Sequence, residues 1–245
     1  MQAGPEAESR RCDIALVLAL AAEMASLQAA LNTHPEAAIV VMQSGPGADR
    51  AARTARQLVD QGARGLISWG LAGGLEPQLG PGSVLVPKRV IGPDGTVRST
   101  DLRWQGRLVE VLGAEFEVHE GDLLGSLQVL ESPRQKARLA LACGGAAVDM
   151  ESAAIGGVAV EASVPFVVLR VVADCLIDTL PRGVSDWVTP DGQTRLAPVL
   201  AALLRPSQWG PLARLATRYR AAHRTLDKLA LKLVPAAFEY PPLNS

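Results

Sequence analysis

Four short apolar runs, rich in Val, Ile and Leu, set the limits on how this chain can fold. They comprise residues 14–19, 39–43, 65–69 and 164–173, and the first three lead directly into glycines or into a helix-like segment. Runs of this length and composition are typical of strands buried on both faces, and their alternation with helices indicates an α/β sheet. The 245 residues suffice for one large core, so the pattern predicts a single α/β domain.

Acidic side chains lie at the ends of two of these predicted strands. Asp174 directly follows the last run, and Glu23 lies where the first strand passes into the helical segment 20–27. Ligands of open α/β sheets bind beyond the carboxyl ends of the strands. We therefore expect both carboxylates at the same end of the sheet, although Asp174 alone fits equally well as a cap of the next helix.

A third carboxylate, Glu151, precedes the last strand. Residues 148–162 predict a buried helix that begins near Met150, with Glu151 in its first turn. A carboxylate there either matches the helix dipole or serves a ligand. Together with Asp174, it indicates a site that binds a sugar and protonates a leaving group.

Glycine-rich loops follow the second and third strands. Ser44, Gly45 and Gly47 open a predicted helix, and such a loop presents backbone N–H groups to an anion or a polarised water. The glycines of 70–74 permit a ligand to approach the backbone closely. Further along, residues 83–90 read as a strand, 104–113 as a helix, and 91–107 as an exposed excursion between them.

These motifs occur in the order and spacing of the purine nucleoside phosphorylase and methylthioadenosine nucleosidase superfamily, which the chain resembles over residues 12–232. The stretches that carry the resemblance are 14–27, 44–47, 70–74, 81–86, 148–154 and 170–174. The resemblance implies a single-domain three-layer sandwich with a central mixed twisted sheet flanked by helices. We expect a disordered lead at 1–11 and a C-terminal tail at 233–245.

Within that superfamily, the C-terminal part resembles the hopanoid-associated phosphorylase branch. The stretches concerned are 180–183, 191–192, 198–206 and the basic helix 211–229. This branch implies removal of adenine from adenosylhopane in hopanoid biosynthesis by a homo-oligomer. The alternatives are a methylthioadenosine or S-adenosylhomocysteine nucleosidase and, from another class, a noncatalytic nucleoside-binding protein.

The resemblance also implies roles for the acidic residues. Asp174 would protonate the departing adenine, since a partly desolvated carboxyl group is held in its neutral form. Glu151 would bind the ribose hydroxyls, with Met150 packed on the sugar. Glu23 matches the glutamate that activates water in the nucleosidases. A role beside the substrate is implied for Gly70, Ala72, Gly73 and, in the purine-contacting loop, for Leu127, Gln128 and Val129.

The attacking nucleophile stays open between water and phosphate. Phosphorylases commonly place a Ser or Thr where this chain has Leu71, and the retained Glu23 argues for water. The branch resemblance argues for inorganic phosphate as co-substrate, with Ser44, Gly45 and Gly47 as its site, and we lean to phosphorolysis. No other cofactor is expected. Arg170, inside a buried strand, is expected to pair with a carboxylate such as Glu23.

Composition excludes several other classes. A net charge of −1 and the lack of an aromatic and basic stripe argue against nucleic acid as a partner. Neither a Gly-x-Gly-x-x-Gly fingerprint nor a Gly-x-Ser-x-Gly elbow is present. The histidines lie far apart, so no metal site is expected, and we expect them at the surface or at helix caps; they are His34, His119 and His223. The three cysteines, Cys12, Cys143 and Cys175, read as free buried thiols.

The C-terminal helix allows two interpretations. Leu212, Leu215, Tyr219, Ala222, Leu226 and Leu229 form an apolar stripe beside basic residues. The stripe either packs on the sheet or, with Trp187 and Trp209 nearby, rests on an anionic membrane surface. No apolar run reaches the roughly 18 residues of a spanning helix. We therefore expect a cytoplasmic protein, with peripheral contact to the inner membrane as the second interpretation.

Overall fold

The structure is a computed structural model that describes residues 14–35, 37, 39–181, 183, 187–195 and 209–234. The strands are β1 (Ile14–Leu18), β2 (Ile39–Gln43), β3 (Gly65–Gly74), β4 (Val84–Leu85), β5 (Arg89–Ile91), β6 (Val97–Ser99), β7 (Val118–His119), β8 (Leu123–Gly125), β9 (Ala147–Asp149) and β10 (Phe166–Asp174). The helices are α1 (Ala21–Thr33), α2 (Ala48–Asp60), α3 (Leu102–Gly113), α4 (Pro133–Cys143), α5 (Ser152–Ala162) and α7 (Trp209–Leu233). The expected lead at 1–11, the branch segment 198–206 and residues 235–245 of the expected tail lie outside the described residues.

The ten strands form one mixed sheet. Its order is β6-β5-β8-β9-β3-β10-β4-β7, and β1 also lies against β3 with β2 beyond it. β1, β2, β3 and β10 run parallel, whereas β9 and β4 are antiparallel to their central neighbours. The predicted α/β class with a central mixed sheet is confirmed.

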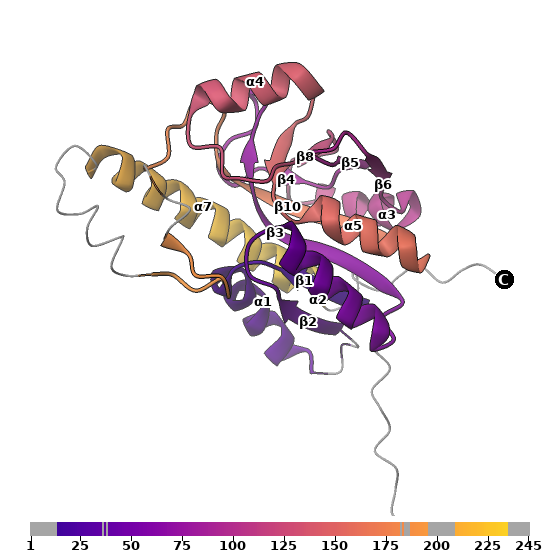
Figure 1. The fold of residues 1–245 in the computed structure, drawn as a ribbon. Helices are drawn as coiled ribbons and strands as arrows, with labels where there is room; N and C mark the ends of the chain where they lie inside the picture. Colours follow the sequence, from indigo (N-terminus) through magenta and orange to yellow (C-terminus); the bar gives the residue numbers. More distant parts are fainter. Residues whose placement is uncertain are drawn as a thin grey trace, which may run out of the picture.

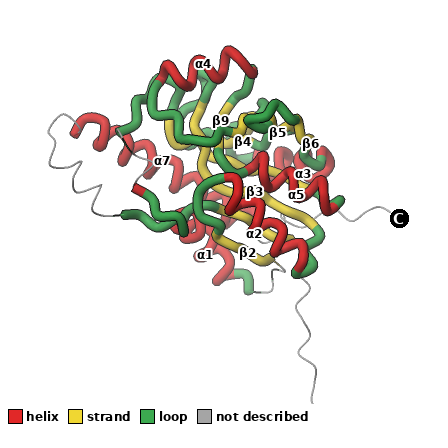
Figure 2. Tube along the Cα trace, in the orientation of Figure 1, coloured by secondary structure: helices red, strands yellow, loops and turns green. Residues whose placement is uncertain are grey.

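Alternate residues of the central strands face two separate cores. Leu16 and Val167 pack in the core that α1, α3 and α7 cover, and Ala15 and Val168 pack in the core that α2 and α5 cover. Helices therefore lie on both faces of the sheet, with the strands as the middle layer (Figures 1 and 2). The apolar runs lack a polar alternation because both faces are buried.

Strand β3 has different neighbours along its two halves. β1 pairs with the first half as far as Ser68, and β9 returns antiparallel along the second half, with Val148 opposite Gly73. β10 follows the other edge of β3 through both halves. The carboxyl ends of β1 and β9 consequently meet beside the middle of β3, and this meeting point carries the candidate site.

The chain between 83 and 113 departs from the prediction. The expected strand 83–90 is two short strands, β4 and β5, separated by Pro87, which has no N–H group to donate to a ladder. The expected excursion 91–107 contains β6, which pairs antiparallel with β5, and the first turns of α3. The Asp94 side chain accepts hydrogen bonds from Thr96 and closes the turn between β5 and β6.

The helix expected to begin near Met150 begins later, at Ser152. Val148 and Asp149 belong to β9, and α5 begins only at Ser152. Glu151 is the N-cap residue of α5 rather than a member of its first turn, and its side chain does not cap that helix. Val148 pairs with β3, and this long-range pairing overrides the local helical preference.

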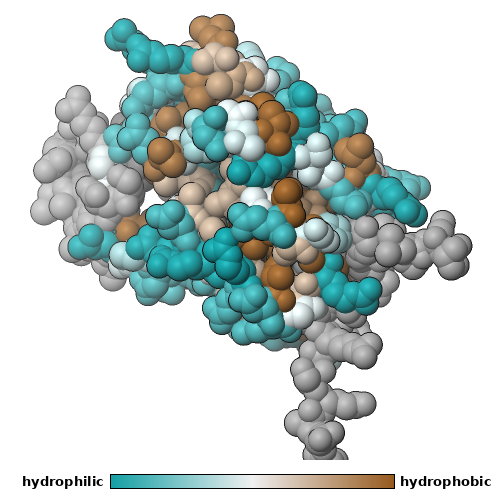
Figure 3. All heavy atoms as spheres, turned by 45° about the vertical axis from the view of Figure 1, so that its right-hand side comes forward, coloured by the Kyte–Doolittle hydropathy of each residue, from teal (hydrophilic) through white to brown (hydrophobic). Residues whose placement is uncertain are grey.

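Helix α7 turns its apolar stripe inward. Ala222, Leu226 and Leu229 are fully buried against the core that α1 and α3 share, and Leu212 and Leu215 are half-buried. This is the packed arrangement, the first of the two interpretations of the stripe. Within the described part of the chain, no helix is both long and apolar enough to cross a membrane. On the face drawn in Figure 3, hydrophobic residues form small groups among hydrophilic ones.

The cysteines and histidines differ in burial more than the sequence predicted. Cys143 ends α4 and is exposed, so the prediction of a buried thiol is wrong there, while Cys175 is half-buried. His34 is the C-cap of α1, as expected for a capping residue. His223 is half-buried on α7 and its ring contacts Tyr219.

Candidate active site

Glu23 lies buried at the start of α1, directly beyond the end of β1. Only 2% of its surface is exposed. Its Oε2 accepts the backbone N–H groups of Ala19 and Leu20, both at 2.9 Å, and its Oε1 accepts that of Leu71 at 2.9 Å. Burial raises the pKa of this carboxyl group, against the lowering effect of Arg170 and of the three N–H donors. Glu23 thus bridges β1 and the middle of β3.

Gly70 makes room for this carboxylate. It lies opposite Arg170 in the register of β3 and β10. A Cβ atom on Gly70 would lie 2.3 Å from Glu23 Oε1 and 2.4 Å from a guanidinium nitrogen of Arg170. The glycine therefore has a packing role, and it allows the two charged groups to meet above the strand.

Arg170 holds a buried polar cluster together. Its Nη2 lies 2.5 Å from Asp149 Oδ2 and donates to the hydroxyl groups of Ser68 at 2.8 Å and Ser152 at 3.0 Å. The two hydroxyl groups are 2.9 Å apart. Glu151 is 3.9 Å from the guanidinium. Arg170 was expected to pair with a carboxylate such as Glu23, and it does pair with a carboxylate, that of Asp149.

Glu151 reaches from the N-cap of α5 to the glycine loop after β2. Its Oε1 accepts the N–H group of Gly47 at 2.8 Å, and Gly47 is itself the N-cap of α2. Burial, then the nearby Asp149 charge, raises the pKa of Glu151 to about 7, while Arg170 and the Gly47 N–H group oppose the shift. The glutamate is therefore sensitive to any charge that forms beside it.

The cluster combines three carboxylates with one guanidinium. Glu23, Asp149 and Glu151 surround Arg170, so the fully ionised cluster has an excess of negative charge in a buried place. Such an excess is costly in the free protein, as the raised pKa of Glu151 reflects. It becomes favourable when a positive charge develops nearby, and the cluster is therefore suited to a cationic transition state.

Asp174 lies at the end of β10, opposite Gly73 of β3. Its side chain is 14% exposed and forms an ion pair with Lys136 of α4, which is 1% exposed. Lys136 also donates to the Cys175 carbonyl at 2.6 Å. Burial raises the pKa of Asp174, although Lys136 and, less strongly, Arg218 pull it down. This carboxyl group thus has an environment in which it can hold a proton.

A cavity of about 220 Å³ opens beside Asp174. Its wall consists of the chain after β10 and the first turns of α7, with Ile177, Asp178, Thr179, Leu180, Arg214, Leu215 and Arg218. Arg218 forms an ion pair with Asp178, whose carboxylate also accepts the Cys175 N–H group at 2.8 Å. Leu180, from one of the stretches that carry the branch resemblance, lies in this wall. A ligand that enters the cavity reaches the Asp174 carboxyl group.

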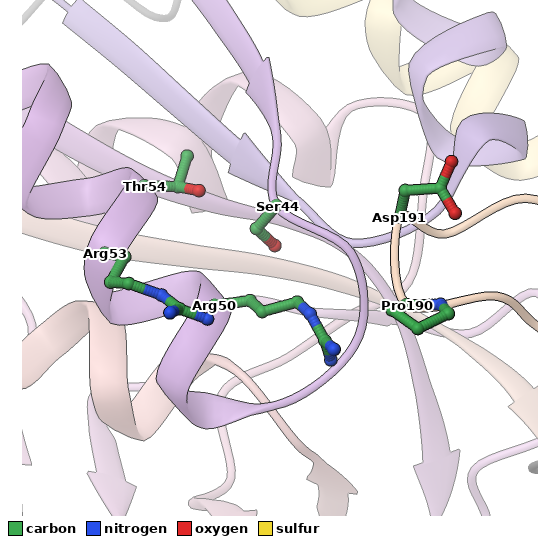
Figure 4. A pocket seen from close by; sticks show the side chains of 6 residues that line it. All are labelled: Ser44, Arg50, Arg53, Thr54, Pro190 and Asp191. Carbon is green, nitrogen blue, oxygen red and sulfur yellow. The ribbon is translucent and has the colours of Figure 1, made fainter.

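The glycine loop after β2 lines a second, more open cavity of about 320 Å³. Figure 4 shows Arg50 and Arg53 on α2, with the Arg50 side chain extended past Ser44 toward the facing Pro190 and Asp191. The Ser44 hydroxyl group donates to the carbonyl of Gly45 in the same loop at 2.7 Å or to that of Leu18 at the end of β1 at 3.1 Å.

Asp191 and Gly192, one of the stretches that carry the branch resemblance, close over the ends of β1 and β2. The Asp191 carbonyl accepts a hydrogen bond from the Gln43 side chain at 2.5 Å, and the Gly192 carbonyl accepts one from the Ala21 N–H group at 3.1 Å. Gly192 has a φ of 81°, and a Cβ atom there would lie 2.2 Å from the Ala19 carbonyl oxygen. The segment 187–195 therefore forms part of the rim of the site.

The predicted base-contacting loop follows β8, whose Gly125 lies opposite Asp149 of β9. The Gln128 carbonyl accepts the Ser126 hydroxyl group at 2.7 Å, Leu127 is 75% exposed, and Val129 is half-buried. Met150 is half-buried between Asp149 and Glu151. The loop and Met150 thus lie at the same end of β8 and β9. Ala72, by contrast, is buried within β3 and its side chain packs in the core under α2 and α5.

Two site residues escaped the sequence analysis. Asp149, just before the expected helix start, had no assigned role, and only its pairing with Arg170 reveals its place. Lys136 lies eight residues after Gln128, in a segment that had no assigned chemistry. Lys136 is the fully buried residue of α4, whereas the neighbouring Arg134 and Arg138 are exposed. A lysine on the buried side of a helix is unusual, and this position distinguishes it from the two arginines.

Comparison with known proteins gives consistent findings. A family model described as the phosphorylase superfamily matches residues 21–205. The fold is similar to a futalosine hydrolase mutant of Helicobacter pylori, with a TM-score of 0.68, 17% identity and coverage of 91% of this chain and 98% of that one. It is also similar to the 5′-methylthioadenosine/S-adenosylhomocysteine nucleosidases of H. pylori (TM-score 0.65, 16% identity, 89% and 97% covered) and Campylobacter jejuni (0.65, 17%, 91% and 100%). A comparison with curated sequences gave no match.

Proposed function

The chain belongs to the phosphorylase superfamily, and on this basis we propose that it cleaves the N-glycosidic bond of an adenine nucleoside and releases adenine. Membership in this superfamily agrees with the prediction that the protein is a nucleosidase or phosphorylase. The observation that carries the proposal is the convergence on β3 of three separate acidic side chains. Glu23 binds the N–H group of Leu71, Asp174 lies opposite Gly73, and Glu151 lies beside the Arg170 that crosses Gly70.

Asp174 is the proposed general acid. Adenine is a poor leaving group as an anion, and a proton on its ring nitrogen N7 lets it depart as a neutral base. The carboxyl group is mostly buried, which favours the protonated form, and it borders a cavity that admits a ligand. A general acid needs both properties.

Glu151 and its neighbours are the proposed ribose site. As the bond to adenine breaks, the sugar acquires oxocarbenium character, and a nearby carboxylate lowers the energy of that cation. Glu151 would hydrogen-bond the 2′ and 3′ hydroxyl groups, with Met150 against the sugar. The other carboxylates of the cluster, Glu23 and Asp149, add to the negative field.

Water is the proposed nucleophile, although the branch resemblance favoured phosphate. Leu71 offers only its N–H group, and that group already binds Glu23. The Gly47 N–H group binds Glu151, so a phosphate at this loop would compete with a carboxylate. The two arginines of the outer cavity favour phosphate as the second candidate, but none of Glu23, Glu151 and Asp174 lines that cavity.

Adenosylhopane is the proposed substrate, on the strength of the branch-specific residues, among which Leu180 and Gly192 lie at the rim. The alternative is a smaller 5′ substituent, as in methylthioadenosine. The decisive experiment incubates the protein with each nucleoside, with and without phosphate, and identifies adenine and the sugar product by mass. Release of adenine together with a free, unphosphorylated ribosyl product supports the proposal. A noncatalytic nucleoside-binding protein would release no adenine from either.

A further inference from the structure

Helix α4 is attached to the rest of the protein in an unusual way. It is well delimited, with a Ser132 and Gln135 capping box at its start and Gly144 in the left-handed conformation at its end. The residue that it buries fully is Lys136, whose ammonium group binds the Asp174 carboxylate and the Cys175 carbonyl. Apolar residues of α4, such as Leu139, are only partly buried.

A purely structural role accounts poorly for this lysine. Burying an ammonium and a carboxylate costs desolvation energy that their attraction recovers only in part, and apolar residues of the same size often stabilise a protein as well or better. The pair also lies on the proposed general acid rather than at a remote place. A lysine that is fully buried in this position indicates a role in the protonation of Asp174.

We propose that Lys136 is a positioning residue that stores the proton which Asp174 delivers to the leaving base. This inference rests on the proposed function, and it explains how a carboxylate bound to an ammonium can act as an acid. Together, the two side chains hold one transferable proton, which belongs to the pair. Lys136 stays out of contact with the base and acts through Asp174.

The proposed step balances as follows. An N–H bond of the Lys136 ammonium breaks and an O–H bond forms on Asp174. That carboxyl group then gives its proton to the base, while the electron pair of the glycosidic bond leaves with the adenine. Asp174 is a carboxylate again and Lys136 is a neutral amine, which regains a proton from solvent through the cavity beside Asp174.

The other charged groups that face the pair are already engaged or more distant. Arg218 of α7 is bound to Asp178, Arg214 lies in the cavity wall, and the Glu131 carboxylate before α4 accepts the Gly183 N–H group. Among the residues that the structure describes, Lys136 is thus the cation that forms an ion pair with Asp174.

Two substitutions separate this role from a structural one. In Lys136→Met, Asp174 must hold the proton alone, so kcat should stay substantial at acidic pH. The midpoint of the alkaline limb of the kcat–pH profile should move to lower pH by about one unit or more. In Lys136→Arg, the guanidinium keeps Asp174 ionised and never gives up its proton. Adenine release should fall by about 10²-fold or more at every pH, the scale for loss of a general acid.

The control is Lys232→Met, which removes a surface ion pair with Glu115 and should leave the pH profile unchanged. In the wild-type protein, 13C-labelled lysine should show one side chain that titrates with the midpoint of the alkaline limb and whose midpoint changes in Asp174→Asn. Three results overturn the role of Lys136 without touching the proposed function. They are an alkaline limb of the pH profile that does not move in Lys136→Met, full activity in Lys136→Arg, and a Lys136 signal that stays charged through the alkaline limb. If the wild-type protein releases no adenine, the proposed function fails as well.

Discussion

Gly70 and Arg170 lie opposite each other on β3 and β10, and the guanidinium of Arg170 and the carboxylate of Glu23 share the space that a side chain at Gly70 would fill. This relationship connects the central sheet to the charged cluster. The strand must be glycine at this point for the ion cluster to be buried at all. It therefore ties the fold to the proposed chemistry.

Gly70→Ala should destabilise the protein and damage the site together. The new methyl group would meet Glu23 and Arg170, and overpacking of a buried place typically costs about 1–3 kcal/mol. Urea unfolding measures the loss, and adenine release should fall with it. Gly106→Ala is the matched control, because a Cβ atom there meets nothing within 4 Å and the position is inside α3. That variant should gain roughly 0.5–1 kcal/mol, and a Gly70→Ala protein of equal stability and activity would contradict the packing argument.

Asp174→Asn should retain the fold and lose turnover. Asparagine has nearly the same shape and its carbonyl can still accept the Lys136 ammonium, but it has no proton to give. Adenine release should fall by about 10²- to 10⁴-fold. Asp60→Asn, an exposed change at the end of α2, serves as the control. Turnover at the wild-type level in Asp174→Asn would exclude Asp174 as the acid.

The long strands and the acidic residues at their ends were predictable from the sequence. Runs such as 14–19 and 164–173 are apolar throughout because helices cover both faces of the sheet, and the structure has β1 and β10 there. Glu23 and Asp174 follow these strands, so their common position at one end of the sheet follows from parallel pairing.

The remaining parts depend on contacts that local sequence does not encode. β4 and β9 have only two or three residues each and form by pairing with the longer strands β10 and β3, while β7 pairs with β4, so these short strands were not predicted from the sequence. The ion pairs of Arg170 with Asp149 and of Lys136 with Asp174 join residues 21 and 38 positions apart. Only the folded arrangement identifies these partners.

Glu23→Gln tests the choice of nucleophile. The glutamate accepts three N–H groups, and the amide nitrogen of glutamine would face at least one of those donors without being able to accept it. If water attacks, turnover should fall by at least about 10²-fold, as for other general bases. Added phosphate should change neither the rate nor the product. Phosphate-dependent release of adenine with a sugar phosphate as product would refute hydrolysis.

Glu151→Gln should flatten the dependence of stability on pH. The pKa of Glu151 is raised to about 7 in the folded protein, from an ordinary value near 4.5, so between these values the folded state keeps a proton that the unfolded state releases. The free energy of unfolding therefore falls as the pH rises through this window, by at most about 3 kcal/mol for this group.

The raised pKa values of Glu23 and Asp174 act in the same direction, so part of the slope should remain in Glu151→Gln. Urea unfolding at pH values from 4.5 to 8 measures the slope, with Glu110→Gln on the exposed side of α3 as the control. A nucleoside analogue with a positive charge at the sugar should bind more weakly to the variant, because the Glu151 carboxylate that would face that charge is gone. If the slope of unfolding free energy against pH is the same in the wild-type protein and in Glu151→Gln, the pKa of Glu151 is not raised in the folded protein.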